Sequence, residues 1–488
     1  MDWLQTLRIS RIISRLESLG RFFTARGIFI CVLGFNWLVY LWETYLSARQ
    51  YRVYKNAASV PPELIGIMDQ TTFNKARAYH LDTAKFSFFC SLVKQFVTTA
   101  VLIFEVNYHI WYLSGKTIAH FGYGSEYEIT QTLVFVFLAS CLNFIIDLPF
   151  SAYGNFVIEE RHGFNKLTPT FFITDKLKKF LVIMMIALPV SACVVQIVKM
   201  GGDYFFLYLW LFSVAVTLIL VTVYLDYIAP LFDKYEPLSE GKLKSDIEEL
   251  SASINFPLKK IYVIEGSKRS AHSNAFFYGF YKNKRIVLFD TLIKDYESKE
   301  DKEHSDNQVN IVCSNLILNA FNCVNKNLNL FFLQNKGGCN NDEILAVLGH
   351  ELGHWKLNHN LKNIVIAQVN LLICFSVFAL LFKKKVLYAA FGFHTEQPIM
   401  IGLLIIILYI LAPYDEIHSF LNTALSRHFE YQADAFAKSM NKAADLRGAL
   451  IKLNKDNLGF PLNDSWYSTW HHSHPSLLER IRALGKID

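Results

Sequence analysis

The sequence contains few charged residues for its length. Of its 488 residues only 18% are Asp, Glu, Lys or Arg, whereas soluble domains carry roughly 25%. Hydrophobic residues make up 52% of the chain, and many of them gather in long apolar runs. A soluble chain of this size would divide into several domains with charged surfaces. We therefore interpret the protein as a polytopic membrane protein.

Cysteine motifs and basic blocks are also missing. None of the eight cysteines forms a C-x-x-C pair, which argues against a cysteine zinc site, and we infer no disulfide framework. The net charge of +6 is modest, and no basic block interleaved with aromatic residues indicates nucleic-acid binding. The first 26 residues lack a small-residue cleavage site, so the apolar run behind them is predicted to be a retained first span.

Long apolar runs are the main feature that the sequence does contain. A helix needs about 20 mainly apolar residues to cross the hydrocarbon core of a bilayer. Seven stretches qualify, near 27–46, 87–113, 130–150, 180–199, 204–229, 363–382 and 397–421. Among the acidic residues inside them, Glu105, Asp147 and Asp226 are notable. Such groups usually face a bundle interior or a water-filled cavity; the alternative is that they mark the ends of spans.

Lysine and arginine are unevenly distributed between the loops that join these spans. The loops at 47–86 and 151–179 hold six and five of them, whereas the second and fourth loops hold little beyond Lys116 and Lys199. Because basic loops stay in the cytosol, the odd-numbered loops and the C-terminus are predicted to be cytosolic. The arginines of the N-terminal tail disagree, and we give more weight to the several loops.

The largest polar segment, 230–362, is the loop between the fifth and sixth spans. A helical stretch near 239–254 is followed by three short runs of β-branched and aromatic residues at 260–264, 274–278 and 285–289. These runs predict a small β-sheet. The edge of such a sheet can hold a substrate backbone by strand addition.

Residues 307–335 do not fit this organisation, because they are rich in asparagine and apolar residues and Lys326 is their only charge. By hydropathy they could form a weak span. A span there would put the strands and the following helix on opposite sides of the membrane. We interpret the segment as a disordered or loosely packed insertion.

The stretch His350-Glu-Leu-Gly-His354 matches the H-E-x-x-H pattern of zinc peptidases. Residues four apart share one face of a helix, so both histidines can bind one metal ion, and Glu351 can reach a water beside it. A long chain can contain this pattern by chance. Because a catalytic zinc keeps three protein ligands, the chain must supply a third.

The segment after the last span contains the candidate for that third ligand. It is a helical run in which Glu430 and Asp434 lie four residues apart on one face. An acidic pair of this kind can belong to a solvated surface, but its neighbours here are apolar and aromatic, so inward-facing carboxylates need a cation. We predict Glu430 as the third zinc ligand and Asp434 as the hydrogen-bond acceptor of a ligating histidine.

These two motifs together, His350-Glu-Leu-Gly-His-Trp355 and Ser426-Arg-x-x-Glu-Tyr-x-Ala-Asp434, resemble the integral-membrane CAAX prenyl protease 1 family, zinc metalloproteases that process farnesylated proteins. The resemblance covers nearly the whole chain and fails mainly at 301–340. Further similar stretches begin at Phe156, Pro230, Gly266, Arg285, Leu453 and His474.

The resemblance implies a mainly α membrane fold, with seven tilted transmembrane helices around an intramembrane chamber that Glu105 would help to line. A gluzincin-like zinc protease domain of helices and a small β-sheet would lie on the cytosolic face. We divide the chain into an N-terminal transmembrane region, a protease segment, two further spans and a C-terminal protease segment. Their boundaries are 1–229, 230–362, 363–421 and 422–488.

The resemblance also implies substrates, cofactor and location. Substrates are proteins that end in a prenylated CAAX motif and lose their last three residues. Some relatives make a second, upstream cut, as in prelamin A or a yeast mating pheromone precursor. One Zn²⁺ per chain is expected. The expected location is the endoplasmic reticulum membrane, with the inner nuclear membrane as a further site and the active site facing the cytosol or nucleoplasm.

Catalytic and substrate-binding roles complete the expectation. Glu351 is predicted to take the proton of the attacking water and pass it to the leaving amine. His474 matches the family's C-terminal histidine and is the candidate oxyanion donor; the alternative is that it caps the helix starting at Pro475. Asn274 matches a strand position expected to hold substrate backbone, with a structural role as the alternative. His359, five residues from His354, is excluded as a ligand because it lies off the metal-binding face.

Two rival functions stay open from the sequence. A membrane quality-control metalloprotease that clears misfolded or stalled chains would need the same zinc site. A catalytically silent scaffold or channel would bind no zinc.

Overall fold

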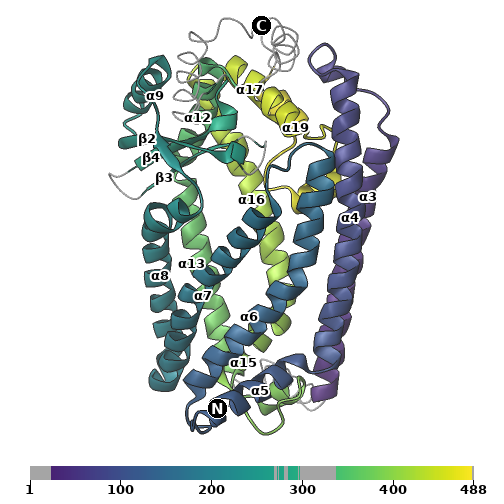
Figure 1. Cartoon of the computed structure of the whole chain (residues 1–488), viewed down its shortest axis with the longest axis vertical. Helices are drawn as coiled ribbons and strands as arrows, with labels where there is room; N and C mark the ends of the chain where they lie inside the picture. Colours follow the sequence, from purple (N-terminus) through teal and green to yellow (C-terminus); the bar gives the residue numbers. More distant parts are fainter. Residues whose placement is uncertain are drawn as a thin grey trace, which may run out of the picture.

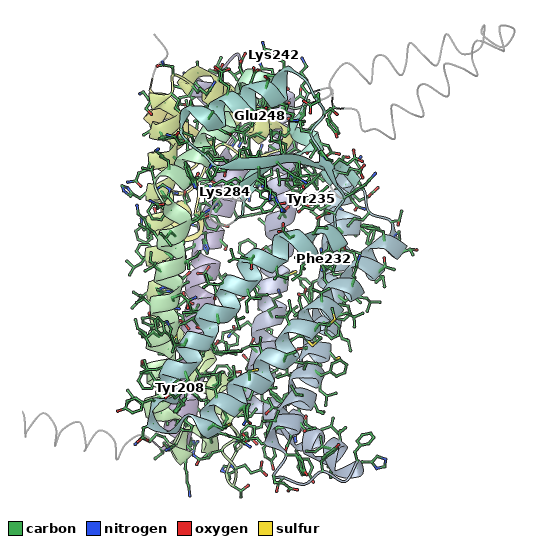
Figure 2. All side chains as sticks on the ribbon, turned by 90° about the vertical axis from the view of Figure 1, so that its left-hand side faces the viewer. Tyr208, Phe232, Tyr235, Lys242, Glu248 and Lys284 are labelled. Atoms are coloured by element: carbon green, nitrogen blue, oxygen red, sulfur yellow. The ribbon has the colours of Figure 1, made fainter. Side chains whose placement is uncertain are left out.

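The computed structural model describes residues 24–268, 272, 274–279, 284–294, 296 and 337–485. The insertion 307–335 lies outside the described residues, as does the N-terminal tail. The long helices form an elongated bundle, and a small sheet and several shorter helices lie at one end of it (Figure 1). Lys242 and Glu248 lie at this end, and Tyr208 lies near the opposite end (Figure 2).

Within the described part of the chain, six helices are long and apolar enough to cross a membrane. They are α3 (Ala25–Asn56), α4 (Gln70–Ile103), α6 (Glu128–Tyr153), α7 (Pro169–Met200), α8 (Phe205–Val223) and α13 (His359–Leu381). A bent pair brings the number to seven if it counts as one span: α15 (Ile399–Ile405) with its extension η8 (Ile406–Ile410), followed by α16 (Ala412–Ser439) after a bend of 61°. A mainly helical membrane protein is therefore confirmed.

Hydropathy alone placed the second span wrongly, at 87–113. Instead α4 ends at Ile103, and α5 (Val106–His120) begins after Glu105, whose φ of 48° is left-handed. A left-handed residue interrupts a right-handed helix. Glu105 thus lies at the end of a span, with its carboxylate against Gly392, which agrees with the alternative that the sequence analysis left open for it.

Polar caps determine where two of the spans begin. The side chain of Asp69 accepts a hydrogen bond from Thr72 N at 2.8 Å at the start of α4, and Thr168 Oγ1 accepts one from Phe171 N at 3.2 Å before α7. Pro169 occupies the first turn of α7, where its missing N–H is not needed. Such caps satisfy N–H groups that have no partner within the helix.

The polar segment between α8 and α13 forms a four-stranded sheet of β1 (Tyr235–Pro237), β2 (Leu258–Ile264), β3 (Ala275–Tyr278) and β4 (Lys284–Phe289). The order is β1-β2-β4-β3; β2 and β4 are parallel, and the other pairs are antiparallel. The three predicted strands and the predicted helix, now α9 (Lys242–Ser253), are confirmed, whereas β1 was not foreseen. In this order β3 is an edge strand.

The C-terminal helices α17 (Ala443–Asp456), α18 (Ser465–His471) and α19 (Leu477–Leu484) pack at the same end of the bundle as the sheet (Figure 1). The first loop and the start of α4 join them through one hydrophobic core. Its buried members are Tyr54, Leu64, Met68, Phe73, Ala76, Ile451, Phe460, Leu477, Leu478 and Ile481. The basic first loop and the C-terminal segment therefore lie on one side of the membrane spans.

Candidate metal centre

Helix α12 (Asn341–Lys356) carries the H-E-x-x-H stretch, and a capping box determines where it begins. Asn340 Oδ1 accepts a hydrogen bond from Glu343 N at 2.9 Å, and Glu343 Oε2 accepts one from Asn340 N at 2.8 Å. Ile344 and Leu348 of α12 are buried in a core shared with the sheet. The position at which α12 begins and the face that it buries together determine the direction in which His350 and His354 point.

The three predicted ligands converge although they come from separate parts of the chain. One ligand atom from each of His350, His354 and Glu430 lies within 4.8 Å of the others. His350 Nε2 and His354 Nε2 are 3.2 Å apart. Glu430 Oε2 is 3.5 Å from the first nitrogen, and Oε1 is 3.2 Å from the second.

Close packing of α12 on α16 brings Glu430 within reach. A Cβ atom at Gly353 would lie 3.1 Å from Phe436 Cβ and 3.2 Å from Ala433 Cα. Such distances are tighter than ordinary contacts, so a larger residue at position 353 would push the helices apart. The glycine inside the motif is thus explained by helix packing.

The polar atoms of the cluster fit a metal ion. Glu430 is 4% exposed and His350 is 5% exposed, and Glu430 Oε2 accepts no hydrogen bond of good geometry. Three nitrogens, His350 Nε2, His474 Nδ1 and Arg480 Nη1, lie within 2.9–3.6 Å of this oxygen without a well-aligned hydrogen bond, and a bound cation would satisfy it. Two imidazoles and one carboxylate are also a usual ligand set of catalytic zinc, which leaves a fourth position open.

The hydrogen-bond partners of the two Nδ1 atoms favour a proton on Nδ1 of His350 and of His354, which leaves each Nε2 free to bind a metal. His350 Nδ1 lies 2.8 Å from Asp434 Oδ1, so its proton is donated there and Nε2 is left as a ligand. His354 Nδ1 lies 2.9 Å from His359 Nδ1, and His359 Nε2 lies 2.9 Å from Gln432 Oε1. If His354 donates from Nδ1, His359 accepts there and donates from Nε2, which leaves His354 Nε2 free for a metal.

Arg480 and His359 were given no role by the sequence analysis. Arg480 donates to Asp434 from Nε at 2.9 Å and from Nη2 at 2.6 Å, and its Nη1 is 3.6 Å from Glu430 Oε2. Its side chain is 11% exposed. Glu430 and Asp434 are two buried carboxylates, and the zinc ion would contact only one of them. The sequence therefore contained a signal that a second cation, here Arg480, had to lie nearby. His359 lies off the ligand cluster, as expected, but it holds the ring of His354.

The electrostatic environment of α12 suits a proton acceptor beside the ligands. Burial raises the pKa of the Glu351 carboxyl, and the neighbouring His350 and His354 act in the opposite direction. Burial lowers the pKa of His350, but hydrogen bonds to Asp434 and Glu430 outweigh it and raise that pKa to about 9 in the metal-free site, so metal binding must displace the proton on Nε2. A carboxylate with a raised pKa is a better general base than an ordinary one.

His474 and Asn274 lie at the margins of the site. His474 Nδ1 is 2.9 Å from Glu430 Oε2, and its side chain is 69% exposed. The N-cap of α19 is Ser476, so His474 does not cap this helix. Asn274 directly precedes β3, a strand that packs against α12, and its Oδ1 accepts a hydrogen bond from Ala275 N at 2.8 Å.

Fold and site together define an integral-membrane metallopeptidase. Residues 50–234 match the family model described as CAAX prenyl protease N-terminal, five membrane helices, and residues 237–488 match Peptidase family M48. These two matches account for most of the chain. The chain belongs to the CAAX prenyl protease 1 family.

Individual relatives are similar over nearly their whole length. The chain is 54% identical to the CAAX prenyl protease 1 homolog of Homo sapiens, over 96% of this chain and 98% of the relative. It is 33% identical to CAAX prenyl protease 1 of Saccharomyces cerevisiae, over 94% and 95%. The crystal structure of S. mikatae Ste24p superposes with a TM-score of 0.79 at 33% identity, covering 94% of this chain and 98% of that one.

Proposed function

We propose that this protein is a zinc-dependent endopeptidase that removes the last three residues of farnesylated or otherwise prenylated CAAX proteins, with one Zn²⁺ per chain. The observation that carries the proposal is the convergence of His350, His354 and Glu430, with Glu351 beside them, in a chain of this family. A second, upstream cleavage of a prelamin A-like substrate belongs to the same proposal, because one centre would perform both.

The chain's own residues divide the chemistry between them. His350, His354 and Glu430 hold the zinc, which when bound supplies a Lewis acid for the attacking water and the scissile carbonyl. Glu351 accepts the proton of the water and passes it to the leaving amine. His474, whose side chain is mostly exposed, donates a hydrogen bond to the carbonyl oxygen as negative charge develops there.

Asp434 and β3 position other groups and do not contact the reacting atoms. Asp434 keeps the His350 ring in one orientation through its 2.8 Å contact with Nδ1. The substrate backbone adds to the edge of β3 that pairs with no other described strand, and Asn274 directly precedes that strand. This places an extended peptide along the strand that packs against the metal-binding helix.

We place the protein in the endoplasmic reticulum membrane, with the inner nuclear membrane as a further location. The metal centre and the basic first loop lie at the same end of the bundle, because that loop shares a core with the C-terminal helices. Basic loops remain in the cytosol. This supports an active site that faces the cytosol or nucleoplasm.

A peptide comparison tests the substrate class. The full-length protein in nanodiscs with zinc should cleave a farnesylated CAAX peptide with a kcat/KM at least about 10-fold above that of the same peptide with an unmodified cysteine. Burial of only two methylene groups contributes ~1.6 kcal/mol, which already corresponds to that factor. Equal values for both peptides would contradict prenyl specificity and favour general clearance of misfolded chains. No cleavage and no bound zinc would favour a silent scaffold.

Arg480→Met should weaken zinc binding by about 10- to 100-fold, as loss of outer partners of metal ligands does. The substitution leaves the buried Asp434 carboxylate without its cation, so the ring of His350 loses its orientation. Competition with a fluorescent chelator measures the affinity. Arg482→Met is the matched control, because Arg482 lies on the same helix, is 63% exposed and pairs with Glu63. Wild-type affinity in Arg480→Met, or an equal loss in the control, would show that Arg480 does not support the site.

A further inference from the structure

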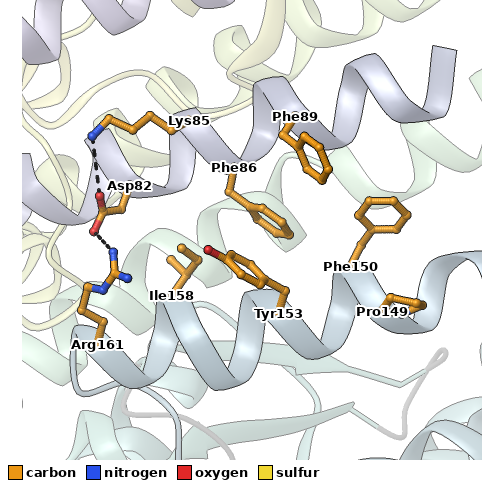
Figure 3. Close-up of a pocket in the computed structure, with 9 residues that line it drawn as sticks. All are labelled: Asp82, Lys85, Phe86, Phe89, Pro149, Phe150, Tyr153, Ile158 and Arg161. Carbon is orange, nitrogen blue, oxygen red and sulfur yellow. Dashed lines mark hydrogen bonds and ion pairs between the residues drawn. The ribbon is translucent and has the colours of Figure 1, made fainter. Parts of the chain in front are cut away.

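A groove with a volume of about 630 Å³ lies between α4 and the end of α6 (Figure 3). None of the three candidate metal ligands lines it. Two pairs of aromatic rings face each other across it. The ring centroids of Phe86 and Tyr153 are 4.7 Å apart, and those of Phe89 and Phe150 are 6.4 Å apart. Phe89 is 57% exposed and Tyr153 is 46% exposed. A separate, polar pocket enclosed with α3 and α18 lies against the opposite face of α4, at His80, Thr83 and Ser87. The aromatic wall therefore opens outward from the bundle.

One end of the groove is charged, and its charges do not balance. Asp82 pairs with Arg161 at 2.9 Å and with Lys85 at 3.9 Å, and His162 Nε2 also lies 3.2 Å from this carboxylate. Asp82 is the only acidic side chain in the lining. Lys85 is 62% exposed and Arg161 is 55% exposed, so both remain accessible. The mouth of the groove therefore carries one excess positive charge.

The groove has a charged end and an apolar end, as a membrane lipid has a charged headgroup and apolar acyl chains. Helix α4 begins at the end of the bundle that holds the metal centre, because Phe73 packs on the C-terminal helices there. Asp82 and Lys85 precede Phe89 along α4, so the charged end is the one nearer the metal centre. The apolar run on α4 begins near residue 87 and the one on α6 ends near residue 150. Lys85 and Arg161 therefore lie outside the runs at the interface, Phe86 and Tyr153 lie at the border, and Phe89 and Phe150 lie inside the apolar runs. At 1.5 Å per residue, Phe89 lies about 10 Å deeper than Asp82.

We propose that this groove binds one phospholipid with an anionic headgroup, taken from the leaflet on the side of the metal centre. The phosphate and headgroup charge contact Lys85 and Arg161, and an acyl chain lies along the rings of Phe86, Phe89 and Tyr153. The outward-facing rings favour a bilayer lipid over the prenyl chain of a substrate, whose peptide must reach the metal centre. The site is independent of the proposed peptidase function.

Lipid retention tests the site directly. The full-length protein is reconstituted in vesicles of equal parts phosphatidylcholine and phosphatidylserine, extracted in mild detergent, and its bound lipids are quantified by mass spectrometry. We expect wild-type protein to retain phosphatidylserine in excess. The double variant Lys85→Gln/Arg161→Gln should lose this excess by at least about 10-fold, since each cation near a membrane surface contributes roughly a factor of 5.

The chain offers a matched control for the charge change. Lys94 lies on the same helix, pairs with Asp147 of α6 at 3.6 Å, is 62% exposed, and does not line the groove. Lys94→Gln should retain phosphatidylserine as the wild type does. Arg161→Lys, which keeps the charge and the partner of Asp82, should retain it too and separates lipid binding from folding. In addition, Phe89→Ala should reduce retention of both lipids.

Three results would overturn the proposal. One is a Lys85→Gln/Arg161→Gln protein that keeps the wild-type excess of phosphatidylserine. Another is an equal loss in Lys94→Gln, which would indicate a general surface effect. The third is displacement of phosphatidylserine by a farnesylated peptide in proportion to its occupancy, which would assign the groove to the substrate. Cleavage activity enters none of these readouts, so failure of the lipid site leaves the peptidase proposal untouched.

Discussion

We expect Glu351→Gln to abolish peptide cleavage while the protein keeps its zinc. The amide has nearly the same shape as the carboxylate but cannot accept the proton of the attacking water. General bases contribute about 10²- to 10⁴-fold to rate, so kcat should fall by at least about 10²-fold. Because Glu351 is outside the cluster of metal ligands, zinc content should stay at one ion per chain. Peptide cleavage and elemental analysis on the same sample measure both quantities.

The matched control for this substitution is Asp342→Asn. Asp342 lies in the first turn of the same helix and is exposed, so the loss of one carboxylate there leaves the metal centre intact. We expect its kcat to remain near wild type. A Glu351→Gln protein with a near-wild-type rate would reject Glu351 as the general base. Loss of zinc in that variant would instead assign it to the ligands.

His350→Ala and Glu430→Gln should each remove stoichiometric zinc and, with it, cleavage. Each variant leaves two ligands from a set of three whose atoms lie within 4.8 Å of one another. Loss of a ligand should cost more than the 10- to 100-fold in affinity that loss of an outer partner costs. Isothermal titration with zinc measures the affinity, and circular dichroism checks that the helices persist.

A histidine near the cluster serves as the control for these ligand variants. His428 lies on α16 two residues before Glu430, is exposed and contacts Gln432 at 3.1 Å. His428→Ala should bind zinc as the wild type does. Full zinc occupancy in His350→Ala would show that the ligands are assigned wrongly, and zinc loss in His428→Ala would place this residue among them.

Several elements could be predicted from local sequence because a local physical rule governs them. The hydrocarbon core demands about 20 apolar residues per span, so the spans are visible as composition. Helical periodicity places His350 and His354 on one face without knowledge of any neighbour. The same rule pairs Glu430 with Asp434, and their apolar flanks indicated a buried position, which the structure shows at 4% and 2% exposure.

Other features could not be predicted, because they depend on contacts between distant residues or on backbone conformation. Hydropathy contains no information on either. The break at Glu105 is a left-handed φ inside an apolar stretch, so the sequence reads as one continuous span. Arg480 reaches Asp434 from 46 residues away, and nothing in the spacing of either motif indicates that pairing. The groove of Phe86 and Tyr153 likewise exists only because α4 and α6 lie side by side.

The sequence by itself determined the type of protein, the metal-binding helix and the identity of the three candidate ligands, because each follows from composition or from the period of a helix. Only the tertiary structure decided how the ligands are held. Gly353 allows α12 and α16 to approach, while Asp434, Arg480 and His359 orient the rings. These contacts arise when helices far apart in sequence pack together, and that packing is a property of the whole fold.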